Sequence, residues 1–126
     1  MSGLTFPPSH RLLVRSDFVQ CYDHGKKRFT NQFIVFVKRR EEAGAPWRLG
    51  VAVTKKIGTA VRRNRVKRLV RECFRLHQRV ITPGHDFVVV PKRGIAPETL
   101  KLVHLEQQML PLFQALGRQS EKHGEV

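Results

Sequence analysis

Residues 48–75 read RLGVAVTKKIGTAVRRNRVKRLVRECFR, and this stretch decides the fold. Its first seven residues, RLGVAVT, predict a β-strand because they form a short apolar run rich in valine. A helix should follow, with Thr59 as its N-cap, and should run to about Val80, just before a Pro-Gly pair. A buried strand that leads directly into a strongly basic helix is therefore the centre of the chain.

The sequence on either side of this centre predicts further strands. Residues 33–37, FIVFV, are apolar at every position, which is typical of a strand covered on both faces. Residues 86–91, DFVVVP, predict another strand, and residues 26–30 a short additional one. The chain should therefore contain a small sheet of three or four strands.

Two more helices are expected, one near each end of the chain. The first spans residues 16–24, with Ser16 as N-cap and Gly25 at its end. The second spans residues 97–116, with Gly117 after its end, and Pro111 should kink or shorten it. Residues 1–9 are expected to form an extended, loosely held arm, and residues 118–126 a flexible tail. The chain is thus predicted to be one α+β domain, residues 1–126, in which helices cover a small sheet.

The charge of the chain points to a polyanionic partner. Twenty-four Lys and Arg stand against ten Asp and Glu, a formal net charge of +14. Because such an excess repels itself in the folded state, nucleic acid is the first candidate partner and an anionic membrane surface the second. No apolar run is long enough to span a bilayer, and Cys21 and Cys73 have no metal or redox spacing. We expect reduced thiols in a cytoplasmic protein, with a structural disulfide as the alternative.

The basic helix should bury one face and expose a row of cations on the other. Residues 55–79 hold ten Lys or Arg and a single acid, Glu72. One stripe is apolar and ends at His77: it comprises Val66, Leu69, Val70, Cys73 and His77, with Phe74 at its edge. The opposite side carries Asn64, Arg68, Arg71, Arg75 and Arg79, flanked by Arg65 and Lys67. A solvated helix face usually mixes charges of both signs. Adjacent arginines instead favour contact with phosphates, to which the guanidinium donates two parallel hydrogen bonds.

RNA is favoured over DNA because the sequence shows no helix-turn-helix pairing, zinc-finger spacing or leucine heptad. A ribosomal or ribosome-assembly protein is the main alternative, and a DNA-binding regulator is another. A role at a membrane surface is the weakest, because the apolar stripe of the helix is only wide enough for its own core. No obligate protein partner is evident.

The quoted segment closely resembles the signature of the bacterial ribonuclease P protein subunit, over about 28 contiguous residues. That family has a strand, a Lys-Lys-x-Gly-x-Ala-Val turn and a helix with Arg-Asn-Arg-x-Lys-Arg-x-x-Arg. Residues 11–27 and 86–92 resemble its N-terminal helix and last strand. The resemblance implies an α/β sandwich with a mixed sheet of about four strands and a left-handed strand–helix–strand crossover, an exception to the usual handedness. It also implies the catalytic RNA of ribonuclease P and precursor tRNA as partners, and removal of the 5′ leader with magnesium held by the RNA.

The resemblance carries over to individual residues. Those that match the basic helix and would face RNA near the cleavage site are Arg63, Asn64, Arg65, Lys67, Arg68 and Arg71. Lys55 and Lys56 match the preceding turn, Arg62 lies at a variable position beside it, and Arg75 extends the cationic row. The positions that match a cleft for the single-stranded leader are Phe18, Tyr22, Ile34, Phe36 and Ala52. Tyr22 departs slightly from the family, in which Phe is common there. From the residues alone, core packing is the simpler interpretation of the three aromatic residues, and the resemblance instead assigns them to unpaired bases.

The chain itself is not expected to catalyse hydrolysis. Two-metal nucleases need clustered carboxylates, whereas the ten acids here are scattered along the chain. The six histidines have no spacing typical of metal ligands. We therefore predict no catalytic residue and no metal ligand in this chain, which would be an accessory subunit.

Overall fold

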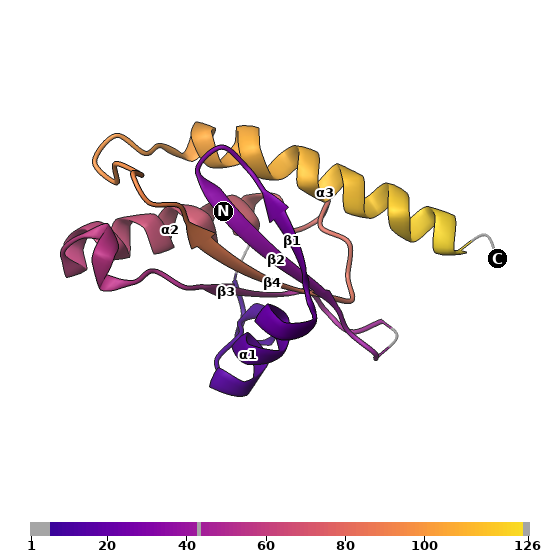
Figure 1. Ribbon diagram of the computed structural model, residues 1–126. Helices are drawn as coiled ribbons and strands as arrows, with labels where there is room; N and C mark the ends of the chain where they lie inside the picture. Colours follow the sequence, from indigo (N-terminus) through magenta and orange to yellow (C-terminus); the bar gives the residue numbers. More distant parts are fainter. Residues whose placement is uncertain (1–5, 43, 125–126) are drawn as a thin grey trace.

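Four strands form one mixed sheet in the order β1-β2-β4-β3, with a helix layer on each face (Figure 1). The computed structural model describes residues 6–42 and 44–124, with side chains as far as Gln119. The elements in chain order are the 3₁₀ turn η1 (Pro8–His10), α1 (Arg15–His24), β1 (Lys26–Phe29), β2 (Phe33–Arg39), β3 (Arg48–Val51), the 3₁₀ turn η2 (Lys55–Ile57), α2 (Ala60–Leu76), β4 (His85–Pro91) and α3 (Leu102–Gly124). The predicted α+β domain with a four-stranded sheet is confirmed.

The two faces of the sheet are covered unequally. Alternate residues of β2 (Phe33, Val35 and Val37) are buried against α2 and α3, which lie together on one face. The other face carries only α1 and a smaller core around Leu12, Cys21 and Val88. The intervening β2 residues Ile34 and Phe36 remain half-buried. The prediction that β2 is covered on both sides therefore holds fully for one face and partly for the other.

The β3–α2–β4 segment forms the strand–helix–strand unit at the centre of the chain. β3 and β4 are parallel neighbours, whereas β1–β2 and β2–β4 are antiparallel. The Thr59 side chain accepts a hydrogen bond from the Arg62 N–H, as predicted for the N-cap. β3 ends at Val51, three residues early, and α2 ends at Leu76, four residues early. The left-handed sense of the crossover stays a prediction.

α1 ends at His24, before Gly25, as predicted, whereas its expected start and both expected limits of α3 were wrong. α1 begins at Arg15, so Ser16 lies inside the helix and does not cap it. α3 begins only at Leu102, after two turns, and continues through Pro111 and Gly117. Pro111 is exposed, so the helix loses one backbone hydrogen bond there while its neighbours keep the core contacts that hold it together.

The predictions for the two chain ends are only partly tested. Part of the predicted arm, residues 1–5, lies outside the described residues. Phe6 packs on Trp47 with ring centroids 5.8 Å apart, so the arm is not loose from this residue on. The backbone of residues 118–124 is helical, so that segment begins as part of α3, and its flexibility stays a prediction.

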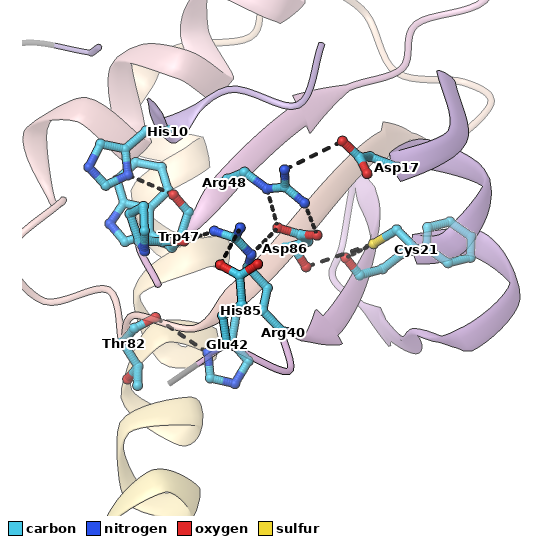
Figure 2. Close-up of polar contacts among 12 residues, drawn as sticks. His10, Asp17, Cys21, Arg40, Glu42, Trp47, Arg48, Thr82, His85 and Asp86 are labelled. Carbon is cyan, nitrogen blue, oxygen red and sulfur yellow. Dashed lines mark hydrogen bonds and ion pairs between the residues drawn. The ribbon is translucent and has the colours of Figure 1, made fainter. Parts of the chain in front are cut away.

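A buried carboxylate joins α1 to the sheet (Figure 2). Asp86 on β4 is 3% exposed and accepts two hydrogen bonds of 2.8 Å from the Arg48 guanidinium. Arg48 also reaches Asp17 of α1 at 3.4 Å, and Arg40 lies 3.9 Å from Asp86. The Asp86 carboxylate raises the pKa of Arg48, mainly through these hydrogen bonds. This network links α1 to its face of the sheet through Asp17.

The Cys21 thiol strengthens the same junction. Its Sγ donates to the carbonyl oxygens of Phe36 and Asp86, at 3.4 and 3.7 Å. Both cysteines are free and buried, which confirms the predicted thiols and excludes the alternative disulfide. Burial raises the pKa of each thiol to about 12, so both stay protonated near neutral pH.

Candidate nucleic-acid interface

The outer side of α2 presents the predicted row of basic and polar side chains. Asn64, Arg68 and Arg71 are exposed, and Lys67 is half-buried beside them. The apolar stripe on the opposite side is buried as predicted at Val66, Val70, Cys73 and Phe74. His77 ends the helix, and its ring is 2.7 Å from a carboxylate oxygen of Glu106 on α3. Packing of one face therefore holds the other face rigid toward solvent.

Three of the predicted RNA-binding arginines have partners within the chain. Arg65 donates to the carbonyl oxygens of Pro97 and Leu100, at 2.7 and 2.9 Å. Arg62 pairs with Glu98 at 2.5 Å, and Arg75 pairs with Glu72. The Arg75 guanidinium lowers the pKa of Glu72 through a hydrogen bond. The expected row of free cations is therefore interrupted at Arg75 by Glu72 of the same helix. The partners of Arg62 and Arg65 lie in the turn before α3, which could not be placed against α2 from the sequence.

The remaining cations surround a hollow beside α2. Its volume is ≈ 350 Å³, and it is lined by Phe6, Arg11, Asn64, Lys67, Arg68 and Arg71 together with the Glu72–Arg75 ion pair. Within the part of the chain that the structure describes, no carboxylate pairs with Lys67, Arg68 or Arg71. Burial, and then the charge of Arg11, lowers the pKa of Arg71. An anion in this hollow would offset both effects by its attraction to Arg71 and Arg11, so the lining favours a phosphate.

Arg11 is a candidate that sequence analysis missed. Its guanidinium donates to the Phe6 carbonyl at 3.0 Å and lies 5.3 Å from the centre of the Phe6 ring. Residue 11 pairs with Leu49 of β3, which brings the N-terminal segment next to α2. No local pattern signals this contact, because it depends on a bridge between residues 38 positions apart.

The other predicted basic residues lie at the start of α2. Lys55 and Lys56 are exposed in η2, between β3 and the helix. Arg63 is half-buried, and its Nε has no hydrogen-bond partner among the described residues. The basic turn therefore continues the cationic surface toward the end of β3.

The predicted leader residues lie on the sheet face that carries α1. Phe18 and Phe36 pack around the small core of this face, together with Ala52. Tyr22 is 39% exposed and meets Phe36 edge-on, with ring centroids 4.9 Å apart and an interplanar angle of 86°. Burial raises the pKa of Tyr22, so its phenol stays neutral near neutral pH. Core packing and partial exposure of an aromatic ring at Tyr22 are thus both present where α1 meets β2.

Gly50 allows this arrangement because a Cβ at that position would lie 2.5 Å from two atoms of the Phe18 ring. Gly50→Ala is expected to destabilise the fold by about 1–3 kcal/mol, since Phe18 must move or α1 must shift. Urea unfolding measures this change. Gly117→Ala is the control: its Cβ would meet only Thr82 Oγ1 at 3.7 Å, and alanine favours the helix. Equal unfolding midpoints for Gly50→Ala and the original chain would contradict the tight Phe18 contact.

The described residues also bear on two other kinds of site. Within them, no three His, Cys, Asp or Glu side chains gather in a group that could hold a metal ion. No helix among the described residues is both long enough and apolar enough to cross a bilayer.

Comparisons with known proteins agree with this geometry. The family model described as Ribonuclease P matches residues 6–117. The ribonuclease P protein component of Oleidesulfovibrio alaskensis is 48% identical over 106 residues, covering 84% of this chain and 85% of that protein. That of Maridesulfovibrio salexigens is 38% identical over 120 residues, covering 95% and 97%.

Solved structures give the same result at the level of the fold. The RNase P protein from Thermotoga maritima superposes with a TM-score of 0.74 at 34% identity, covering 83% of this chain and 96% of that one. The Staphylococcus aureus RNase P protein has a TM-score of 0.72 at 27% identity, covering 85% and 94%. Sequence and fold therefore lead to one conclusion: the chain belongs to the ribonuclease P protein family, whose members are accessory subunits of an endoribonuclease.

Proposed function

We propose that the chain binds the catalytic RNA of ribonuclease P through α2 and takes the 5′ leader of precursor tRNA into the cleft beside α1. The observation that carries this proposal is the continuity of the two surfaces. β3, on the cleft face, leads through Lys55 and Lys56 directly into α2. A strand of RNA that leaves the basic helix can therefore enter the aromatic cleft without crossing an acidic surface of β3 or η2.

The basic side chains of the hollow account for the first half of the proposal. Lys67, Arg68 and Arg71 would neutralise phosphates close to the cleavage site, with Asn64 and Arg11 beside them. Arginine suits this task because its planar guanidinium donates two hydrogen bonds to one phosphate. Arg62, Arg65 and Arg75 would contribute mainly as nearby positive charge, since their guanidinium groups are already engaged.

Hydrolysis of the leader would use magnesium ions that we assign to the RNA. The described residues offer no cluster of carboxylates and imidazoles for such ions, so this chain does not fit as their holder. Its part would be to position RNA and reduce repulsion between phosphates where the ions bind. A cytoplasmic location belongs to the same proposal.

The cleft would also favour precursor tRNA over mature tRNA. Unpaired bases stack on aromatic faces with little dependence on sequence. Tyr22 and Phe36 provide such faces, and the Lys27 ammonium lies 5.6 Å from the Phe36 ring centre, where it can meet the backbone phosphates. A leader of any sequence could therefore add affinity that mature tRNA cannot obtain.

Tyr22→Ala tests the cleft in the holoenzyme assembled from this chain and ribonuclease P RNA. We expect affinity for precursor tRNA to fall roughly 5- to 150-fold, the loss of one stacked base, with no change for mature tRNA. Equilibrium binding of the two tRNAs measures the difference. Val80→Ala is a matched control, because Val80 is also an exposed apolar residue but follows α2.

Equal losses for precursor and mature tRNA in Tyr22→Ala would contradict a leader cleft. Thermal unfolding of the free variant separates this outcome from damage to the fold. Phe18→Ala is the less clean variant, because Phe18 also fills the space above Gly50.

A further inference from the structure

The sheet face that carries α1 extends beyond the part that the helix covers. Strand register arranges its side chains in rows that cross the sheet. In the row beneath α1, Lys27 faces Phe36, Phe36 faces Val88, and Val88 faces Gly50. Phe18 of α1 lies directly over Gly50, and Tyr22 lies against Phe36. The helix therefore covers most of this first row and leaves Phe36 half-buried.

The next row is open. It runs from Phe29 on β1 through Ile34 on β2 to Val90 on β4. Ala52 continues it past the end of β3, where its N–H donates to the Val89 carbonyl at 3.0 Å. Ile34, Val90 and Ala52 are half-buried, and Phe29 is 67% exposed. The row thus forms an apolar path that runs from beyond the end of β3 across β4 and β2 to β1, where it ends on an exposed aromatic ring.

A fixed cation lies next to that ring. The Lys92 ammonium is 5.7 Å from the centre of the Phe29 ring and donates to the Thr30 carbonyl at 2.6 Å. The Lys92 backbone N–H is bonded to the Gln32 carbonyl, so the base of the side chain is also held. Among the described residues, no other ring stacks on Phe29. An open aromatic face beside an ordered ammonium is the combination that binds an unpaired nucleotide.

We infer that Phe29 and Lys92 form the outer end of the leader cleft. An unpaired base stacks on Phe29, and its phosphate meets the Lys92 ammonium. This inference rests on the proposed function and adds to the residues that the family resemblance implies. Because Ala52 lies on the side of η2 and α2 while Phe29 lies on the opposite edge strand, the nucleotide at Phe29 is further from the cleavage site than those at Tyr22 and Phe36. Three strand spacings, about 14 Å, separate the two ends of the row.

A protein partner on the β1 edge is the competing occupant of the exposed ring. Lys26, Lys27 and Arg28 occupy the same edge strand as Phe29. Three consecutive cations oppose pairing with a second copy of this strongly basic chain, and charged edge strands generally resist such pairing. The same charges favour RNA, so we assign the surface to the leader.

Substrates with leaders of increasing length test the inference in the assembled holoenzyme. For the original chain, affinity should rise with each nucleotide that reaches a further binding position. For Phe29→Ala, the final rise should be lost, with at least about fivefold weaker binding of long leaders and no change for short ones. Phe29→Trp should restore the rise, because indole also stacks. Lys92→Ala should weaken binding of long leaders and should make that binding less dependent on salt concentration. Arg93→Ala removes an adjacent exposed charge and should change neither quantity.

The pattern across variants distinguishes the possible failures. If Tyr22→Ala weakens binding of precursor tRNA while Phe29→Ala leaves the affinity unchanged at every leader length, the inference is wrong and the proposed function stands. If the effect of neither variant on binding depends on the leader, the inference and the proposed function are both wrong. If Phe29→Ala instead changes the sedimentation of the free chain, with unchanged tRNA binding, Phe29 is a protein contact and the inference is overturned. Unchanged thermal unfolding of Phe29→Ala confirms that the binding data report on the surface.

Discussion

Replacing Arg68 and Arg71 together by alanine is expected to weaken binding to ribonuclease P RNA by about 100-fold. The estimate takes about 1.5 kcal/mol for the phosphate contact of each arginine. The slope of log affinity against log salt should also decrease in magnitude by up to about 1.8, because two fewer phosphates are neutralised. Filter binding over a series of salt concentrations measures both quantities.

The chain contains a matched control for this double variant. Arg62 and Arg75 lie on the same helix but pair with Glu98 and Glu72. Removing both of them deletes the same number of charges, yet the affinity should fall much less. The Arg68 and Arg71 variant should also unfold no earlier than the original chain, since it relieves repulsion between Arg71 and Arg11. Equal losses of affinity in the two double variants would show that only net charge matters.

Asp86→Ala is expected to destabilise the free protein by about 3 kcal/mol. The substitution leaves the Arg48 guanidinium beneath α1 without the carboxylate that accepts two of its hydrogen bonds. Removing one partner of a buried ion pair is strongly destabilising because the other charge stays desolvated. Urea unfolding of the free chain gives the difference in stability.

Two further variants test whether the loss of stability in Asp86→Ala comes from the broken buried ion pair. Asp17→Ala should cost under about 1 kcal/mol, because its carboxylate is partly exposed and lies 3.4 Å from Arg48. The double variant R48M/D86L should cost less than Asp86→Ala, since it removes the buried pair as a whole. If Asp86→Ala and Asp17→Ala unfold at the same urea concentration, the buried network does not hold α1 in place.

The sequence predicted most of the fold because its local signals were strong. The apolar runs of β2 and β4 and the cap at Thr59 need only neighbouring residues, and all three were confirmed. Boundaries that depend on tertiary packing were missed. Pro111 indicated a break in α3, but the ring lies at the exposed side of a helix whose other side is buried in the core.

In the candidate site, too, features set by local sequence were predicted, whereas contacts set by tertiary packing were missed. The position of the basic row on α2 follows from helical periodicity, and the family resemblance supplied the cleft residues. The pairing of Arg65 with the turn at Pro97 and the approach of Arg11 to Arg71 could not be predicted, because they join segments far apart in the sequence. The role of Phe29 depends on strand register, which the short β1 segment does not determine by itself.

Membership of the ribonuclease P protein family decides against the ribosomal-protein and DNA-regulator alternatives. It leaves one physical question, which is whether the unpaired cations beside α2 lie against RNA during cleavage. The direct measurement is the rate at which ribonuclease P RNA cleaves precursor tRNA at low magnesium concentration, with and without this chain. We predict strong stimulation by the original chain and little by the Arg68 and Arg71 double variant. No stimulation, or equal stimulation by the double variant, would contradict the account.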